Sequence, residues 1–291
     1  MTGAVLALSR AQPLDWRRGL PLLAAAAAFV VLFWSPMVTL GRDWWSDPDA
    51  GHGLLLAPVA VYLAWKRGLV AGAKGQVVAG TLILLAAVLL RYVSGLAAEL
   101  FTMRASMLGA LFGLVVFYLG FRQLLHWWLP ASLLVLSVPL PDVVLGSLAL
   151  PLQLRASQMG AGLLEWRDVP VALSGNVIRL PGRSLFVTEA CSGLRSLASL
   201  ISLGLLIGGL WLRHPASRVL LLVAAIPVAM FLNGIRVFLT GFLVFYVNPK
   251  LGEGFMHVTE GWIIFVVAFA ILGGIALLLT RAESWVGRRR A

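Results

Sequence analysis

Three residues with side chains suited to catalysis, Cys191, Arg236 and His257, lie far apart along this 291-residue chain. Cys191 is the single cysteine, and it stands among polar neighbours that include Glu189 and Ser192. The apolar run that follows predicts a helix whose N-terminal N–H groups and dipole stabilise a thiolate and lower the thiol pKa. We therefore interpret Cys191 as a candidate nucleophile. The alternative is a small interfacial residue without a chemical role.

The three residue types match the three tasks of acyl transfer. A thiolate attacks a carbonyl, an imidazole carries the proton to and from the leaving amine, and a cation stabilises the oxyanion. Arg195 is a second candidate cation, because it follows Cys191 by four residues on the same predicted helix face. Other readings stay open: Arg195 pairs with Glu189, Arg236 extends to a lipid phosphate, and His257 is an interfacial histidine without a catalytic partner.

The composition indicates an integral membrane protein. Hydrophobic residues make up 60% of the chain and charged residues 12%, which is too few to cover a soluble globule. The net charge of +11 comes from short basic clusters between apolar runs, a pattern typical of membrane anchors, so we expect no nucleic-acid partner. A lone cysteine forms no intrachain disulfide. We expect no cleaved signal peptide, no metal and no cofactor.

Apolar runs predict about eight membrane-spanning helices. They are Leu20–Leu40, Gly53–Trp65, Val77–Leu96, Ala105–Leu119, Leu124–Val138, Leu197–Leu212, Val219–Val247 and Gly261–Thr280. Basic residues at alternate ends place both termini in the cytoplasm and the loop 41–52 outside. We expect an all-α polytopic protein with a cytoplasmic segment 1–19, one transmembrane domain 20–281 and a basic tail 282–291.

The pattern changes between residues 142 and 190, which we expect on the extracytoplasmic side. Val143–Trp166 is apolar but interrupted by Pro151 and Gln153, which predicts an interfacial or re-entrant helix. Three β-rich segments joined by two turn sequences predict a small hairpin or meander directly before Cys191. These segments are Val169–Leu173, Val177–Leu180 and Leu185–Thr188.

This topology selects among the four histidines. His126 and His214 fall on cytoplasmic turns, whereas His52 and His257 fall on the outer side together with Cys191. Only the outer pair can reach the thiol.

The same topology places Arg236 near the outer boundary. Counted from Val219 at 1.5 Å per residue, it lies roughly 25 Å across a hydrocarbon core of about 30 Å. An arginine within a span is costly and usually functional, and Asn233 lies one turn away. Cys191, Arg236 and His257 are therefore expected at one depth.

Five stretches, which together cover most of the chain from His52 to Trp262, carry a further signal. They are Gly175–Pro181 followed by Glu189–Ser196, Asn233–Arg236, His257–Gly261, Gly51–Leu55 with Pro58, and Pro139–Pro141 with Pro151–Gln153. In these stretches the chain resembles the exosortase/archaeosortase family of multi-spanning cysteine transpeptidase-like enzymes. The cysteine stretch is highly specific, whereas the histidine stretch alone is weak.

The resemblance implies Cys191, Arg236 and His257 as catalytic residues in the inner membrane. It also implies substrates: secreted proteins with a C-terminal tail of a PEP-CTERM type, which combines a short signal, a transmembrane helix and a basic end. The resemblance further implies membrane lipids around the site and an acceptor for the acyl group, which is an amine, water or a polysaccharide or lipid group, often in connection with exopolysaccharide production. We expect supporting roles for Glu189, Ser192, Arg195, Asn233 and His52.

Other classes of function stay open. A lipid-directed acyl or glycosyl transferase could use the same three groups, and a non-catalytic component of a polysaccharide export machine would need none of them. A transporter or channel is disfavoured, because the predicted spans are nearly free of ionisable residues at mid-depth.

Overall fold

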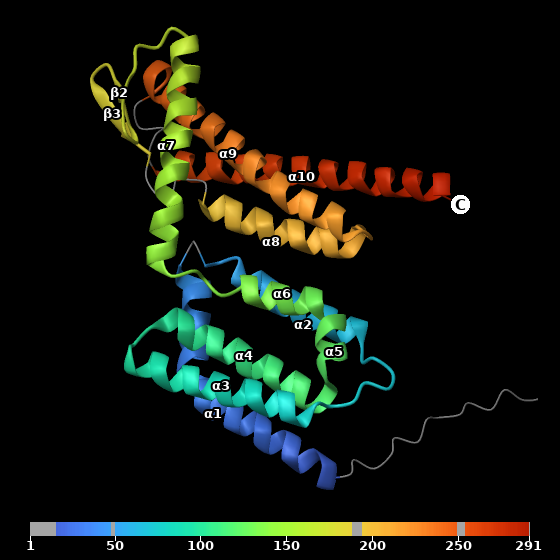
Figure 1. Ribbon diagram of the computed structural model, residues 1–291. Helices are drawn as coiled ribbons and strands as arrows, with labels where there is room; N and C mark the ends of the chain where they lie inside the picture. The colour runs from blue at the N-terminus through green and yellow to red at the C-terminus, as the bar shows by residue number, and fades with distance from the viewer. Residues whose placement is uncertain (1–15, 48–49, 188–193, 249–253, 291) are drawn as a thin grey trace, which may run out of the picture.

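The computed structural model describes residues 16–47, 50–187, 194–248 and 254–290, which form ten helices and one three-stranded sheet (Figure 1). The elements are α1 (Trp16–Ser46), α2 (Gly53–Arg67), α3 (Val77–Leu96), α4 (Leu100–Leu119), α5 (Phe121–His126), α6 (Trp128–Leu136), α7 (Asp142–Trp166), β1 (Ala172–Ser174), β2 (Val177–Leu180), β3 (Arg183–Phe186), α8 (Leu194–Trp211), α9 (Pro215–Tyr246) and α10 (Gly254–Arg290). The predicted class, an all-α polytopic membrane protein with a small sheet, is confirmed.

The predicted number of about eight spans is not confirmed among the described residues. Five helices there are long and apolar enough to cross a membrane. They comprise Leu20–Ser46, Val77–Leu96, Leu100–Leu119, Pro215–Tyr246 and Ile263–Arg288. The apolar part of α8, Leu197–Trp211, is shorter, and α2 has only 15 residues.

Helix α1 continues through residues 41–46, where a loop was expected. Within α1, Phe33 has non-helical dihedral angles and marks a kink. Pro36 has no N–H to donate to the Leu32 carbonyl, and its ring lies too close to that carbonyl for a regular helix. Both effects explain the kink. Arg91 Nε on α3 lies 3.3 Å from that carbonyl oxygen and donates to it instead.

The predicted span Leu124–Val138 is divided into two short helices, α5 and α6. Pro130 cannot donate to the His126 carbonyl four residues earlier, so the helical hydrogen bonding is interrupted at this point. Arg67 Nη1 donates to that carbonyl at 2.9 Å. At the junction, Trp127 Nε1 donates to Gly68 O at 3.1 Å, which ties the break to the end of α2.

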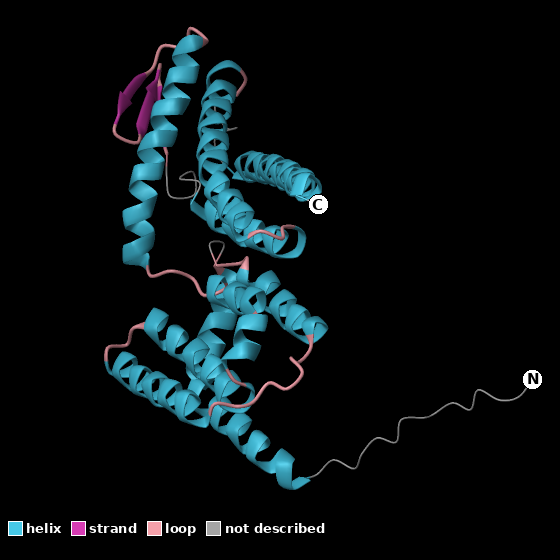
Figure 2. Cartoon of the chain, turned by 45° about the vertical axis from the view of Figure 1, so that its right-hand side comes forward, coloured by secondary structure: helices cyan, strands magenta, loops and turns pink. Residues whose placement is uncertain are grey.

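Helix α7 is continuous through Pro151 and lies crosswise to α8 and α10 (Figures 1 and 2). It is not among the five candidate spans, and its expected interfacial or re-entrant position stays a prediction. The antiparallel meander β1-β2-β3 follows, with turns at Gly175 and Gly182, which both have positive φ. The predicted meander is therefore confirmed, although β3 begins at Arg183 instead of Leu185.

Two apolar clusters hold the second half of the chain together. One joins α7, β2 and α9 through buried residues that include Leu164, Ile178 and Val237. The other joins α8, α9 and α10 through residues that include Leu200, Leu232 and Leu272. Helix α9 belongs to both clusters, so it connects the sheet with the α8–α10 pair.

Candidate functional site

The structure describes the backbone and side chain of some predicted site residues, only the backbone of others, and neither for the rest. Glu189, Cys191 and Ser192 lie in residues 188–193, outside the described residues. For Arg195 and His257 the structure gives the backbone: each lies in the first turns of a helix, α8 and α10 respectively. The side-chain geometry therefore rests on Arg236, Asn233 and His52.

Arg236 and Asn233 line a small cavity enclosed by α8, α9 and α10. Its volume of about 10 Å³ is roughly that of one water probe. Asn233 is 5% exposed. Arg236 is partly buried as a residue, and its Nε atom is buried. The other lining residues are Leu200, Ala229, Leu232, Ile264, Phe265 and Ala268. Two polar side chains thus meet inside an otherwise apolar three-helix junction.

The N-terminal ends of α8 and α10 lie on the same side of this cavity. Both helices begin at the same end of the bundle, at the left in Figure 1. Leu200 follows the first residue of α8, Leu194, by about 9 Å of helix, and Ile264 follows His257 by about 10 Å. Cys191 precedes Leu194 by three residues. The fold therefore brings the start of α8, the start of α10 and the Arg236 cavity into one region.

Helix N-termini favour negative charge in this region. The first N–H groups of a helix have no intrahelical acceptor, and the aligned peptide dipoles place about half a positive charge there. Arg236 adds a full positive charge from α9. A thiolate or an oxyanion is the species that such surroundings stabilise.

A hydrogen-bonded group holds the chain just before the predicted nucleophile. Asn176 Nδ2, in the β1–β2 turn, donates to Val187 O at 3.1 Å and lies 3.2 Å from Gln153 Oε1 on α7. Val187 N donates back to Asn176 O at 2.9 Å. Val187 is 3% exposed and Gln153 is 6% exposed. The residue that follows β3, Val187, is thereby fixed four positions ahead of Cys191.

Sequence reasoning did not assign a role to this group. Asn176 was part of a turn and Gln153 interrupted an apolar run, and both lie in stretches that carry the family resemblance, but neither was given a role of its own. A buried amide needs hydrogen-bond partners, so the combination of a glutamine in an apolar helix and an asparagine in a neighbouring turn was the available signal.

Close helix contacts set the position of α9 against α7. Gly234, between Asn233 and Arg236, faces Met159, and a Cβ at this position would approach the Met159 side chain within 2.9 Å. Gly160 on α7 likewise faces Val237. The two helices therefore approach closely at glycines, and this contact positions the segment of α9 that carries Arg236.

His52 lies in the other half of the molecule. It precedes α2, and its Nε2 atom is 3.2 Å from Leu136 O at the end of α6. It is not among the residues that line the Arg236 cavity. Its supporting role stays a prediction.

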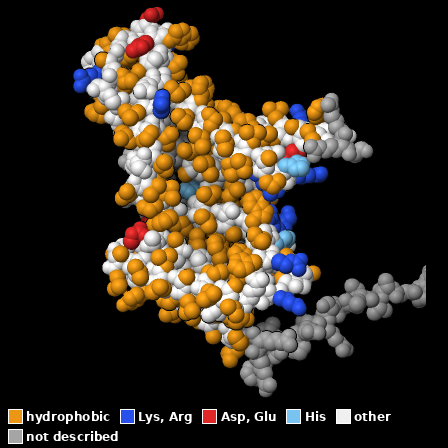
Figure 3. Space-filling model, viewed as in Figure 1, with side chains coloured by type: hydrophobic (Ala, Val, Ile, Leu, Met, Phe, Trp, Pro, Cys, Tyr) orange, Lys and Arg blue, Asp and Glu red, His pale blue; other side chains and the backbone are white. Residues whose placement is uncertain are grey.

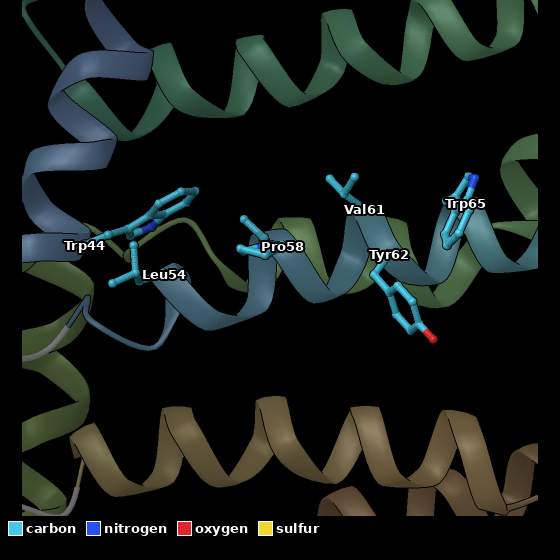
Figure 4. Close-up of a pocket in the computed structure, with 7 residues that line it drawn as sticks. Trp44, Leu54, Pro58, Val61, Tyr62 and Trp65 are labelled. Atoms are coloured by element: carbon cyan, nitrogen blue, oxygen red, sulfur yellow. The ribbon is translucent and has the colours of Figure 1, made fainter.

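A second hollow is an open groove of about 540 Å³ along α2. Figure 4 shows Trp44 from α1 at one end and Trp65 at the other, with Pro58 and Val61 between them. The lining is almost entirely apolar and contains no Cys, His, Asp, Glu, Lys or Arg. An apolar groove of this kind suits lipid or an apolar segment of a protein chain. No group of three or more His, Cys, Asp or Glu suited to a metal ion occurs in the described parts of the chain.

Comparison with known proteins gives one match. No curated protein and no solved structure matches the chain. A family model described as transmembrane exosortase matches residues 44–274, well over half of the chain. The matched range contains Cys191, Arg236 and His257 together with α2 to α9 and most of α10. The chain therefore belongs to the transmembrane exosortase family.

Proposed function

We propose that this exosortase is a membrane-embedded cysteine peptidase or transpeptidase that cleaves C-terminal sorting tails of exported proteins at the outer face of the cytoplasmic membrane. The observation that carries the proposal is the cavity lined by Arg236 and Asn233, beside which α8 and α10 begin. The residues expected to supply the nucleophile and the base, Cys191 and His257, belong to the sequences at those two helix starts.

The proposed reaction has two steps. The Cys191 thiolate attacks the carbonyl carbon of the scissile peptide, and Arg236 with the helix N–H groups stabilises the oxyanion. The C–N bond breaks, His257 protonates the leaving amine, and a thioester joins Cys191 to the retained part of the substrate. An acceptor amine or water then gives its proton to His257 and attacks the thioester, which releases the thiolate.

The surroundings of the site favour a tail that arrives through the membrane. The outer surfaces of α9 and α10 expose large apolar side chains, among them Val223, Phe231 and Ile263. Such surfaces match lipid or an apolar helix, and a membrane-anchored substrate reaches them by lateral diffusion. A PEP-CTERM-like tail with its own transmembrane helix fits this route.

The test is co-expression of the full chain with a tagged, tailed substrate, followed by intact-mass determination of the product. We expect the parent protein to produce a new C-terminus, and Cys191→Ala to leave the substrate uncut. Arg236→Gln should lower the rate by roughly 100-fold or more, the effect of removing one oxyanion donor, whereas Arg195→Gln should lower it less. Normal processing by Cys191→Ala would refute the proposal. A mass increase on a lipid instead of a shortened protein would favour a lipid-directed transferase.

A further inference from the structure

Two arginines meet on one indole ring at the end of the bundle opposite the candidate site. The Arg67 guanidinium carbon, at the end of α2, lies 5.8 Å from the centre of the Trp128 ring, and that of Arg218, in the first turn of α9, lies 4.8 Å from it. Trp128 is the first residue of α6. Three elements that are distant in sequence thus place two like charges within reach of each other.

No carboxylate of the described residues pairs with either guanidinium. The carboxylate at this end of the bundle, Glu283, accepts hydrogen bonds from the backbone N–H groups of Arg213 and His214, both at 3.0 Å. Burial and the charge of Arg218 lower the pKa of Arg67 from its ordinary value. Arginine nevertheless stays protonated in proteins. The pair therefore has two uncompensated positive charges.

Hydrogen bonds to the backbone fix both guanidinium groups. Arg218 donates from Nε and Nη2 to Leu212 O at 3.1 and 2.8 Å, and Arg67 donates from Nη1 to His126 O at 2.9 Å. A guanidinium has five N–H donors, so each group retains donors for a further acceptor. Fixed guanidinium forks suit phosphate, which they bind through paired hydrogen bonds.

The pair lies where lipid headgroups are expected. Figure 3 shows Lys, Arg and His side chains gathered at this end, on the right of the view, next to broad hydrophobic surface. Leu125 and Val219, close in sequence to Trp128 and Arg218, are 70% and 59% exposed. Basic pockets between membrane helices bind anionic headgroups while the acyl chains cover apolar surface.

We propose that Arg67, Arg218 and Trp128 form a binding site for one phosphate group, supplied by an anionic phospholipid. The site is separate from the proposed peptidase site. Its phosphate offsets the repulsion between the two arginines and joins α2, α6 and α9 at one end of the bundle.

The test uses the full chain purified in detergent, both as the parent protein and as the Cys191→Ala variant. Phosphatidylglycerol, phosphatidylcholine and inorganic phosphate are added as separate ligands. Native mass spectrometry gives the occupancy of each lipid, and thermal unfolding gives the accompanying shift in Tm. We expect Arg67→Gln and Arg218→Gln to weaken phosphatidylglycerol binding by about tenfold or more, the effect of a lost charge-assisted contact. Arg218→Lys, which keeps the charge and loses the fork, should show part of that loss.

Arg122→Gln is the matched control, because Arg122 is an exposed α5 residue and its replacement removes one positive charge near the same end. It should bind phosphatidylglycerol like the parent. If Arg122→Gln and Arg218→Gln weakened phosphatidylglycerol binding equally, the effect would come from general surface charge, and the proposal would be overturned. Binding of phosphatidylcholine as strong as that of phosphatidylglycerol would also overturn it. If millimolar inorganic phosphate displaced phosphatidylglycerol, the same phosphate site would be supported, with a soluble anion as its ligand.

Discussion

Polar side chains in this protein pair with backbone oxygens over long sequence distances. Asn176 donates to Val187 O, Arg67 to His126 O and Arg91 to Leu32 O. In each case the side chain satisfies a carbonyl that local structure leaves available, and an unsatisfied carbonyl in an apolar environment is costly. These contacts give individual residues a measurable effect on the folded state.

Replacement of Asn176 by alanine should affect both stability and activity. Asn176→Ala removes the amide that holds Val187 O and leaves the buried Gln153 without this contact. We expect a loss of about 1–2 kcal/mol in unfolding free energy and slower substrate cleavage, because the end of β3 leads to Cys191. Unfolding titrations and cleavage rates measure the two effects.

Ser174→Ala is the control for this experiment, since Ser174 is an exposed residue of β1 in the same sheet. It should leave both quantities unchanged. If Asn176→Ala lowers stability but cleaves at the parent rate, the contact is structural and does not position the nucleophile.

Residue types alone identified Arg236 and Asn233 as site candidates, because polar groups inside an apolar span are rare and costly. Both side chains line one small cavity, and their role in a reaction stays a prediction. The partner of Asn176 could not be predicted in the same way, since Gln153 lies 23 positions earlier and the contact depends on how α7 packs against the sheet.

At the scale of elements, α7 and α9 pack through glycines. A Cβ on Gly160 would overlap the Val237 side chain, whereas a Cβ on Gly162, in the same helix, meets nothing within 4 Å. We expect Gly160→Ala to lower the unfolding free energy by about 1–3 kcal/mol through overpacking. Gly162→Ala should be neutral or stabilising by up to about 1 kcal/mol, because alanine favours the helix. Thermal or denaturant unfolding in detergent compares the pair, and equal effects would exclude close α7–α9 contact at Gly160.

The start of α4 predicts a dependence on pH. Glu99 caps this helix by accepting from Phe101 N at 3.0 Å and Thr102 N at 2.6 Å. Hydrogen bonds from Thr102 hold the Glu99 pKa below its ordinary value, which is about 4.3. Because the folded-state pKa is the lower one, this stabilisation is complete above the unfolded value and disappears as pH falls through the folded value.

The parent should therefore be more stable than Glu99→Gln near pH 7, and the difference should shrink from about pH 5 downward. Unfolding titrations over this pH range measure it. A difference that is constant with pH would show that the charge of Glu99 contributes nothing to the cap.

The boundaries of elements were less predictable than their existence. Hydropathy predicted one span for Leu124–Val138, but Pro130 removes a helical donor and Arg67 compensates the freed carbonyl. The donor that satisfies this carbonyl comes from α2, so the apolar residues of the segment alone could not indicate the contact. The meander was predictable because its turns carry local signals, including Gly175 and Gly182.

At the scale of the whole molecule, the apolar runs predict more spans than the five candidate helices of the described residues confirm. Helix α2 has 15 residues, or about 22 Å, which is short for a hydrocarbon core of about 30 Å. Helix α7 has 25 residues but lies crosswise to α8 and α10 (Figure 1). Length and composition define which helices can cross a membrane, whereas packing decides their direction, and packing depends on distant residues such as those of the α7–α9 contact.

The orientation of the whole protein can be tested through its single cysteine. Cys191 and the basic end that contains Arg122 are expected on opposite sides of the membrane, because basic residues remain cytoplasmic. A membrane-impermeant maleimide should label Cys191 in spheroplasts before lysis. In a Cys191→Ser background, Arg122→Cys should be labelled only after lysis, and Cys191→Ser alone should give no label. Labelling of Arg122→Cys, and not of Cys191, in sealed spheroplasts would invert the topology and place the proposed peptidase site on the wrong face for exported substrates.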